Sequence, residues 1–318
     1  MKQTHKDIQN WYKIHGRIDL PWRTTTDPYH IYLSEVMLQQ TQVKTVLERY
    51  YFPFLKKFPT LKTLANAPLD DVLKSWEGLG YYTRAANLHK TAKRISELPS
   101  DIDTLIKLPG IGKNTAHAVA VFAFKKPVPI MEANVKRILC RLHTLTTPTD
   151  KELWKIAYAL VDKENPFDYN QAMMDIGATL CAPKKPSCEL CPLSNICQGK
   201  NNPTLYPTKK KRVVPTREQN IMVSVYNDKL SLFQRSDKFL HGLWGFPTIE
   251  VPLCASEYIG EITHAYTHFK LVCKVYVYDE LDKEQEHYFA TTEIRKLAIS
   301  KVDDKILNLY LDTIKVNN

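Results

Sequence analysis

The stretch CAPKKPSCELCPLSNIC (181–197) carries four cysteines, Cys181, Cys188, Cys191 and Cys197, in the spacing C-x6-C-x2-C-x5-C. Thiolates this close together on a short loop indicate a bound metal, because disulfides do not require such regular spacing. A structural zinc site with four thiolates usually has two C-x2-C pairs, and this loop has only one. The unequal gaps therefore favour a [4Fe–4S] cluster, whose iron corners are spread in space, over a zinc ion or a loop without metal.

The length and composition limit the classes of protein to which the chain can belong. The 318 residues suffice for two domains, and the formal net charge of +10 comes from Lys and Arg dispersed along the chain. This charge favours a polyanionic partner, nucleic acid before an anionic membrane, although it also fits a soluble protein that is merely basic. There is no apolar signal core and no apolar run of the roughly 18 residues that span a bilayer. With its free thiols, the chain is expected to be a soluble cytoplasmic monomer, in a bacterial cytosol or nucleoid rather than a nucleus.

The two halves of the chain differ in predicted secondary structure. Residues 1–202 predict helices, with helical apolar spacing in 31–38 and 115–124 and short Pro or Gly breaks between the helices. Residues 218–318 change to short β-rich runs, which are 221–226, 230–233 and 271–278. Between them, residues 203–217 are rich in Pro and Lys and predict an extended linker. Its basic run, Lys209–Arg212, could contact phosphates or serve as a nuclear signal, although a solvated linker is the simpler interpretation.

A second motif, LPGIGKNTA (108–116), lies between two predicted helices. Gly110 and Gly112 allow a tight turn that exposes backbone N–H groups at the start of a helix, where the helix dipole adds positive potential. A lone G-x-G usually means only a turn. Flanked by two helices, this sequence predicts a phosphate-binding helix-hairpin-helix.

Several segments together resemble the adenine DNA glycosylases of the MutY type, within the endonuclease III-like superfamily. Besides the hairpin and the cysteine loop they are LPWR (20–23), DPYHIYLSEVMLQQTQV (27–43), WEGLGYYTRAANLH (76–89) and YNQAMMDIGATLC (169–181). The second half resembles the Nudix-like domain of that family through FQRSDKFLHGLWGFP (233–247) and HAYTHFKL (264–271). Plain endonuclease III relatives lack this domain.

The resemblance implies a fold and an activity. The fold is a mostly α helix-hairpin-helix glycosylase domain with an iron–sulfur loop at 1–202, followed by an α+β Nudix-like domain at 218–318. The activity is that of a monofunctional glycosylase in base excision repair, which hydrolyses the N-glycosidic bond of adenine mispaired with 8-oxoguanine or guanine in double-stranded DNA. The implied cofactor is a [4Fe–4S] cluster bound by the four cysteines of 181–197.

Two carboxylates are candidates for the chemistry. Glu35 lies in an apolar helical segment, where desolvation raises a carboxyl pKa and keeps the acid protonated for a leaving base. A salt-bridged helix glutamate is the plainer interpretation without the motif. The second candidate departs from the family, which usually has Asp-Gly-Asn-Val where this chain has Glu132-Ala133-Asn134-Val135. Glu132 retains the charge that stabilises a cationic sugar, or it merely favours the dipole of a helix N-terminus.

Asn114 is a further departure. Lyase relatives carry a Lys at this position, which forms a Schiff base with the sugar, and Asn cannot do so. Asn114 therefore fits a monofunctional enzyme, and the neighbouring Lys113 leaves weak lyase activity open.

The remaining residues follow from the resemblance alone. Those matching the adenine pocket are Trp22, Arg23 and Asp175, those that wedge into the duplex are Gln40 and Tyr81, and further DNA contacts are expected from Gly110, Gly112 and Asn134. In the second domain, Tyr266-Thr267-His268 replaces the commoner Phe-Ser-His loop that contacts the partner base. The segment after Pro247 lacks the Glu-rich pattern of a Nudix hydrolase, which makes nucleotide hydrolysis unexpected.

Two other functions remain compatible with the sequence. The first is a glycosylase of the same fold with an altered choice of base, and the second is a catalytically silent protein that recognises damaged DNA.

Overall fold

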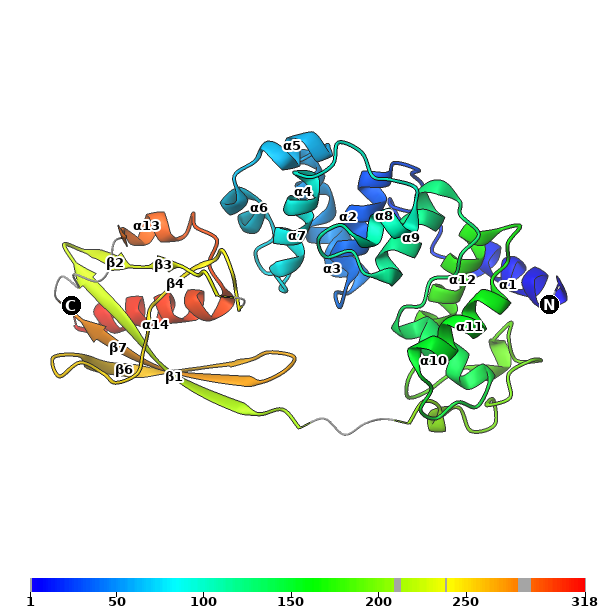
Figure 1. The fold of residues 1–318 in the computed structure, drawn as a ribbon. Helices are drawn as coiled ribbons and strands as arrows, with labels where there is room; N and C mark the ends of the chain where they lie inside the picture. The colour runs from blue at the N-terminus through cyan, green and yellow to red at the C-terminus, as the bar shows by residue number, and fades with distance from the viewer. Residues whose placement is uncertain (1, 209–212, 238, 280–286, 318) are drawn as a thin grey trace. The chain divides into compact units, whose positions relative to one another are not determined.

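The computed structural model describes residues 2–208, 213–237, 239–279 and 287–317 (Figure 1). The chain divides into two compact units, Met1–Gln42 with Arg94–Lys210, and Val43–Lys93 with Lys211–Asn318. The second unit thus combines a helical segment with the β-rich part of the chain. The predicted boundaries at 1–202, 203–217 and 218–318 stay a prediction, and the basic run 209–212 lies outside the described residues.

The first unit is built from helices. They are α1 (Lys2–His15), α2 (Pro28–Leu38), α8 (Ile102–Ile106), α9 (Lys113–Phe124), α10 (Ala133–Leu142), α11 (Asp150–Leu160) and α12 (Pro166–Thr179), with the short 3-10 helices η1 (Cys188–Leu190) and η2 (Pro203–Leu205). One apolar core joins α1, α10, α11 and α12, and a smaller one joins α2 to α9. Helices α2 and α9 are buried on almost every side, since nearly all their side chains are apolar or small.

The helix starts follow from local chemistry. The Asp27 carboxylate accepts hydrogen bonds from the backbone N–H groups of Tyr29 and His30, and Pro28 occupies the first position of α2. Helix α9 begins after Gly112, which has no side chain to cap the helix, so its first N–H groups stay available to a ligand. The predicted helical segments 31–38 and 115–124 are thereby confirmed.

The second unit begins with five short helices, which are α3 (Val43–Arg49), α4 (Tyr51–Lys57), α5 (Leu61–Asn66), α6 (Leu69–Ser75) and α7 (Thr83–Ala92). Its later part has the strands β1 (Thr216–Tyr226), β2 (Lys229–Ser231), β3 (Phe233–Gln234), β4 (Trp244–Gly245), β5 (Thr248–Ile249), β6 (Glu257–Ala265), β7 (Lys270–Tyr278) and β8 (Tyr288–Phe289), and the helices α13 (Thr291–Ile294) and α14 (Lys301–Asn317).

A mixed sheet organises the later part of this unit. Its order is β6-β7-β1-β2-β8, β5 also pairs with β1, and β3 and β4 form a separate pair. Strands β1 and β7 are parallel, whereas β6 and β7 are antiparallel. Helix α14 packs on the sheet, and an apolar core fills the space between them (Figure 1). The predicted fold class, helical first and then α+β, is confirmed.

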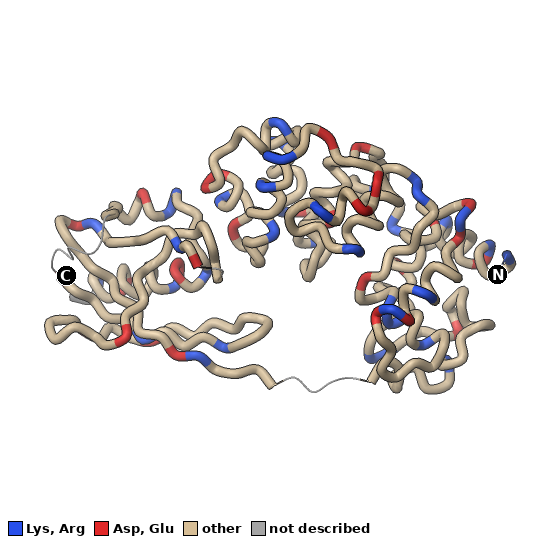
Figure 2. The backbone as a smooth tube through the Cα atoms, viewed as in Figure 1, with Lys and Arg blue, Asp and Glu red and all other residues tan. Residues whose placement is uncertain are grey.

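Charged residues are distributed along both units. Lys and Arg are spread along both units and alternate with Asp and Glu, rather than forming one block (Figure 2). Among the described residues no helix is both long and apolar enough to cross a bilayer.

A largely buried ion pair joins the residue after β3 to the first turn of α14. Arg235 donates two hydrogen bonds of 2.9 Å to Asp303, which is 1% exposed. The same carboxylate accepts from the Phe246 N–H at 3.1 Å and from the Ser300 hydroxyl at 2.6 Å. A Cβ at Gly245 would lie 1.9 Å from an Arg235 nitrogen, so the glycine is required by this close approach.

We expect Asp303→Ala to destabilise the protein by about 3–5 kcal/mol, because it leaves a buried guanidinium and a backbone N–H without their acceptor. Urea unfolding measures the change. The control is Asp312→Ala on the same helix, which removes an exposed pair with Lys315 and is expected to cost less than about 1 kcal/mol. Equal losses for the two variants would contradict the structural role of Asp303.

Candidate active site and DNA-binding residues

Glu35 lies on α2 with buried neighbours on both sides along the chain, Ser34 and Val36. Burial raises the pKa of this carboxyl to about 7, the nearby Glu132 adds to the shift, and Arg23 opposes it. A carboxyl with this pKa is partly protonated at neutral pH and can therefore donate a proton.

Glu132 is the residue that caps α10. Its carboxylate accepts a hydrogen bond of 3.1 Å from the Val135 N–H, and its backbone is extended at φ −80° and ψ 177°. Burial raises the pKa of Glu132, while the backbone N–H groups of Asn134 and Val135 lower it. The first unit thus brings Glu35 and Glu132 close enough for their charges to interact.

Asn114, in the first turn of α9, contacts the chain immediately before Glu132. Its side-chain oxygen accepts a hydrogen bond of 2.7 Å from the Met131 N–H. The amide therefore has a fixed partner, and it provides no amine for a Schiff base.

Asp175 is fully buried and its carboxylate is shared by two arginines. Arg23 donates to it at 2.7 and 2.9 Å, and Arg17 donates through its backbone N–H at 2.9 Å and its Nε at 2.8 Å. Burial opposes ionisation, but the hydrogen bonds and charge of Arg23, followed by those of Arg17, keep the pKa of Asp175 below its usual range. Asp175 thus fixes Arg23, while Trp22 beside it is 4% exposed.

Arg17 was absent from the sequence prediction. Its only signal is a second arginine six residues before Arg23 in RIDLPWR (17–23), and nothing local shows that both meet Asp175 more than 150 positions away.

The hairpin has the predicted helix-hairpin-helix form. Helix α8 ends at Ile106, Gly110 has a φ of +72° that favours glycine, and α9 starts after Gly112. Both glycines are exposed, which leaves their backbone accessible to a phosphate.

Lys113, which the sequence analysis considered for weak lyase activity, contacts aromatic rings. Its ammonium lies 4.1 Å from the centre of the Trp154 ring and 5.9 Å from that of Tyr158. His117 supports this arrangement, since its Nε2 is 2.7 Å from the Tyr158 hydroxyl. The cation–π contact competes with any reach of Lys113 toward a sugar.

Gln40 and Tyr81, the predicted wedge residues, share a backbone feature. Gln40 has a φ of 58° and Tyr81 a φ of 51°, in the left-handed region that non-glycine residues rarely adopt. Such strain is found preferentially at functional sites. Tyr81 belongs to a turn that is fixed by the bonds from Trp76 and Arg84 to the Gly80 carbonyl, both of 3.1 Å.

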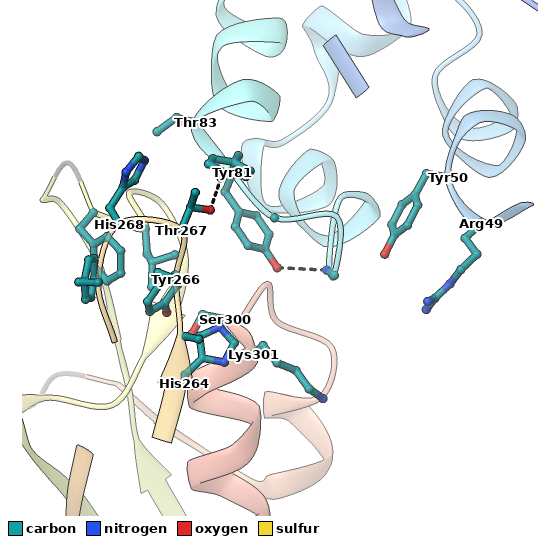
Figure 3. Close-up of a pocket in the computed structure, with 17 residues that line it drawn as sticks. Arg49, Tyr50, Tyr81, Thr83, His264, Tyr266, Thr267, His268, Ser300 and Lys301 are labelled. Carbon is teal, nitrogen blue, oxygen red and sulfur yellow. Dashed lines mark hydrogen bonds between the residues drawn. The ribbon is translucent and has the colours of Figure 1, made fainter. Parts of the chain in front are cut away.

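In the second unit, the loop Tyr266-Thr267-His268 lines a cavity of about 760 Å³ together with Tyr81 (Figure 3). Figure 3 shows the Tyr81 and Thr267 hydroxyls directed at one another, joined by a hydrogen bond. The Tyr266 ring packs against His264, Phe239 and Phe269 at centroid distances of 4.6, 5.2 and 5.0 Å. Tyr266 therefore stabilises the loop by aromatic packing, and Thr267 provides its hydroxyl group.

The segment after Pro247, expected to lack a Nudix metal helix, forms strands. Residues 248–249 are β5 and 257–265 are β6, with a turn between them. The acidic residues of this segment accordingly do not share one helical face.

The four loop cysteines line one small cavity, together with Arg141. Burial raises the pKa of the Cys188 and Cys197 thiols, and that of Cys191 to about 11, so their ionisation needs a metal. Among the described residues, no three His, Cys, Asp or Glu side chains converge as one metal ion requires. A set of four thiols without a histidine has the chemistry to bind either an iron–sulfur cluster or a zinc ion.

Two arginines of α10 connect the helix to this loop. Arg141 is 2% exposed and donates to the Cys181 carbonyl at 3.1 Å, the Cys181 Sγ at 3.2 Å and the Ala182 carbonyl at 2.9 Å. Arg137 donates to the Cys181 carbonyl at 2.8 Å and to the side-chain oxygen of Asn134 at 2.8 Å. Their positive charge offsets that of thiolates in the cavity.

Comparison with known proteins assigns the class. Residues 33–163 match the family described as HhH-GPD superfamily base excision DNA repair protein. A solved structure of a thermostable thymine-DNA glycosylase is similar with a TM-score of 0.58 and 30% identity, over 63% of this chain and 97% of that one. The chain is thus a DNA glycosylase of the helix-hairpin-helix class.

Two curated relatives narrow the assignment. The adenine DNA glycosylase of Buchnera aphidicola subsp. Baizongia pistaciae (strain Bp) is 38% identical over 252 residues, which cover 76% of this chain and 71% of the relative. The adenine DNA glycosylase of Rattus norvegicus is 31% identical over 403 residues, with 96% of this chain and 77% of the relative covered. The chain belongs to the adenine DNA glycosylase family, as the resemblance predicted.

The raised pKa of Glu35 makes a prediction about stability. Below pH 4.5 the carboxyl is neutral in both the folded and the unfolded protein. Between 4.5 and about 7 it ionises only in the unfolded protein, so stability falls as the pH rises through this window, by up to about 3 kcal/mol. Glu35→Gln removes this loss and should be more stable than the wild type at pH 8 but not at pH 4.5.

Thermal unfolding across this pH range tests it, with Glu48→Gln as the control. Glu48 is 56% exposed, and its substitution should leave the pH dependence unchanged. A Glu35→Gln variant that follows the wild-type pH dependence would show that the carboxyl is not buried in solution.

Proposed function

We propose that this chain hydrolyses the N-glycosidic bond of adenine mispaired with 8-oxoguanine or guanine in duplex DNA, as a monofunctional enzyme. The observation that supports it most is the half-buried Glu35, with a pKa of about 7, beside the second carboxylate Glu132. A reaction that must protonate a leaving base while it stabilises a cationic sugar needs one neutral acid and one anion.

Binding of DNA precedes the chemistry. The exposed backbone of Gly110 and Gly112 and the start of α9 bind phosphate, and the net charge of +10 favours the polyanion. Gln40 and Tyr81 insert where the adenine leaves the base stack, since a base inside a duplex is out of reach of any side chain.

The extruded adenine enters the first unit near Trp22 and Arg23. The Arg23 Nε is a buried donor with no hydrogen-bond partner among the described residues, which suits an acceptor nitrogen of the base. Asp175 fixes the rest of this guanidinium, and Trp22 offers a ring face for stacking.

Glu35 donates its proton to the adenine as the glycosidic bond breaks. The carboxylate of Glu132 stabilises the positive charge that develops on the sugar, orients the attacking water and accepts the proton that this water loses. Because Asn114 has no amine, water rather than a Schiff base completes the reaction, which leaves an intact strand with an abasic site.

The partner base contacts the second unit through Thr267, flanked by Tyr266 and His268. The Thr267 hydroxyl can donate to or accept from an oxidised guanine, whose C8 oxygen and N7 hydrogen distinguish it from guanine. The aromatic cavity around the loop supports this contact (Figure 3).

Cys181, Cys188, Cys191 and Cys197 would bind a [4Fe–4S] cluster with a structural role. When bound, the cluster would tie 181–197 into one rigid loop at the end of α10. We further propose that the enzyme acts as a monomer in the cytoplasm of a bacterium.

A different base remains the alternative, because the similar solved structure is that of a thymine-DNA glycosylase. Single-turnover excision separates the candidates, with duplexes that carry adenine opposite 8-oxoguanine, adenine opposite guanine, or a mismatched thymine. We expect the first two to be processed. Excision of thymine alone would favour the alternative, and no excision at any enzyme excess would indicate a protein that only recognises damage.

Glu35→Gln should slow adenine excision by at least about 100-fold, since it removes the proton donor. In the wild type the rate should fall as the pH rises through about 7, where Glu35 loses its proton. Glu48→Gln is the matched control, with an expected rate within twofold of the wild type. An unchanged rate in Glu35→Gln would refute the assignment of the acid.

Arg141→Leu should lower the iron bound per chain by more than half, because the loop loses a guanidinium that holds both Cys181 and Ala182. Iron analysis and absorbance near 400 nm measure this. Lys200→Met alters an exposed residue on the rim of the same cavity and should keep its iron. A full iron content in Arg141→Leu, or zinc in the purified wild type, would overturn the proposed cofactor arrangement.

A further inference from the structure

The peptide groups directly before Glu132 are held by side chains rather than by backbone. Ile130 and Met131 are 1% and 3% exposed, and they lie in an extended segment outside any helix or strand. A buried backbone N–H needs an acceptor. That of Ile130 donates to the side-chain oxygen of Asn170 at 2.7 Å, and that of Met131 to the side-chain oxygen of Asn114 at 2.7 Å.

These two residues, the asparagine pair, come from different helices. Asn114 lies in the first turn of α9 and Asn170 in α12. Asn170 is 2% exposed, and its amide nitrogen donates to the carbonyls of Val128 at 3.0 Å and Pro166 at 2.7 Å. Its oxygen is therefore the atom that faces Ile130, and the side chain has no freedom to turn away.

The other side of Glu132 is equally constrained. Its carboxylate bends back to the Val135 N–H at 3.1 Å. The first turn of α10 lies against α12, where a Cβ on Gly177 would come within 2.5 Å of the Asn134 Cβ. Glu132 thus has fixed backbone before it and a packed helix after it, so that small movements of residues 130–131 are transmitted to the carboxylate.

We propose that the asparagine pair positions Glu132, and that Asn114 contributes to the reaction through this carboxylate rather than by contact with the sugar. The inference rests on the proposed function of the Glu35 and Glu132 site. It explains together the two positions, Glu132 and Asn114, at which this chain differs from the usual residues of the family. A glutamate side chain is one methylene longer than that of an aspartate. The asparagine pair and the bend of the Glu132 side chain toward Val135 together determine the position of the carboxylate. A displacement on the order of 1 Å at a reacting group can cost about 100-fold in rate.

Single-turnover excision of adenine opposite 8-oxoguanine tests the positioning role. Asn114→Ala and Asn170→Ala should each slow excision at least tenfold, while the Kd for the duplex changes less than twofold. Asn114→Asp retains the acceptor oxygen for Met131 and should recover the rate to within about threefold of the wild type. Thr149→Ala is the stability control, because it removes the cap of α11 without contact to residues 130–132, and its rate should stay within twofold.

A double-mutant cycle with Glu132→Asp separates positioning from an independent role. If Asn114 acts through Glu132, the combined loss in Asn114→Ala/Glu132→Asp is smaller than the product of the two single losses. Losses that multiply, or rates in Asn114→Ala within twofold of the wild type, overturn the inference. Should Asn170→Ala fail to fold, the half-buried Asn114 series decides the question alone.

Failure of the proposed function would give a different experimental result. A wild-type enzyme that does not excise adenine would overturn both proposals, whereas active wild type with insensitive asparagine variants would overturn only the positioning role.

Discussion

The site depends on one constraint, which is that the Glu35 carboxyl group keeps a pKa of about 7 among apolar neighbours and is therefore partly protonated at neutral pH. Glu35 meets this constraint because α2 is apolar on nearly every side, so that burial contributes the largest part of its pKa shift. A cation nearby would cancel the effect, and Arg23 does oppose it. Asp175 limits that opposition, since it shares its charge between Arg23 and Arg17. The ion cluster is thus part of the environment of Glu35, the proposed proton donor, rather than a separate stabilising device.

Helix α10 connects the site of Glu35 and Glu132 to the cysteine loop. It begins at the Glu132 cap, and Arg137 and Arg141 on one face of it bond the first residues of the cysteine loop. Residues four apart on a helix share a face, so one rigid element orients both arginines. The cysteine loop and the Glu132 end of α10 are therefore connected through one rigid helix, although the thiols are not among the proposed reacting groups.

Much of the fold and of the candidate site could be predicted from local sequence, and the contacts that were not predicted have a common reason. The apolar helix around Glu35 and the hairpin at Gly110 are defined by neighbouring residues, and both were predicted. The bond from Met131 to Asn114 and the meeting of Arg17 with Asp175 join positions far apart in the chain, which only the packing of several helices decides.

The division of the chain into two units depends on contacts between segments that are distant in the sequence. A change of texture near residue 203 suggested that helices and strands would separate there. By its contacts, however, the helical segment Val43–Lys93 belongs with the later, β-rich part. Composition reports what each segment forms, whereas the grouping depends on side chains such as Asp70 of α6, which accepts a hydrogen bond of 2.8 Å from Gln234.

The same grouping bears on Thr267. Its hydroxyl is already bonded to Tyr81, so a partner base that Thr267 contacts has to replace an existing hydrogen bond rather than satisfy an empty one. Because such an exchange conserves the number of bonds, its net free energy is small, about 1 kcal/mol. Any discrimination between partner bases through this residue would therefore also depend on the geometry that the cavity imposes on the base, to which the aromatic contacts of Tyr266 contribute.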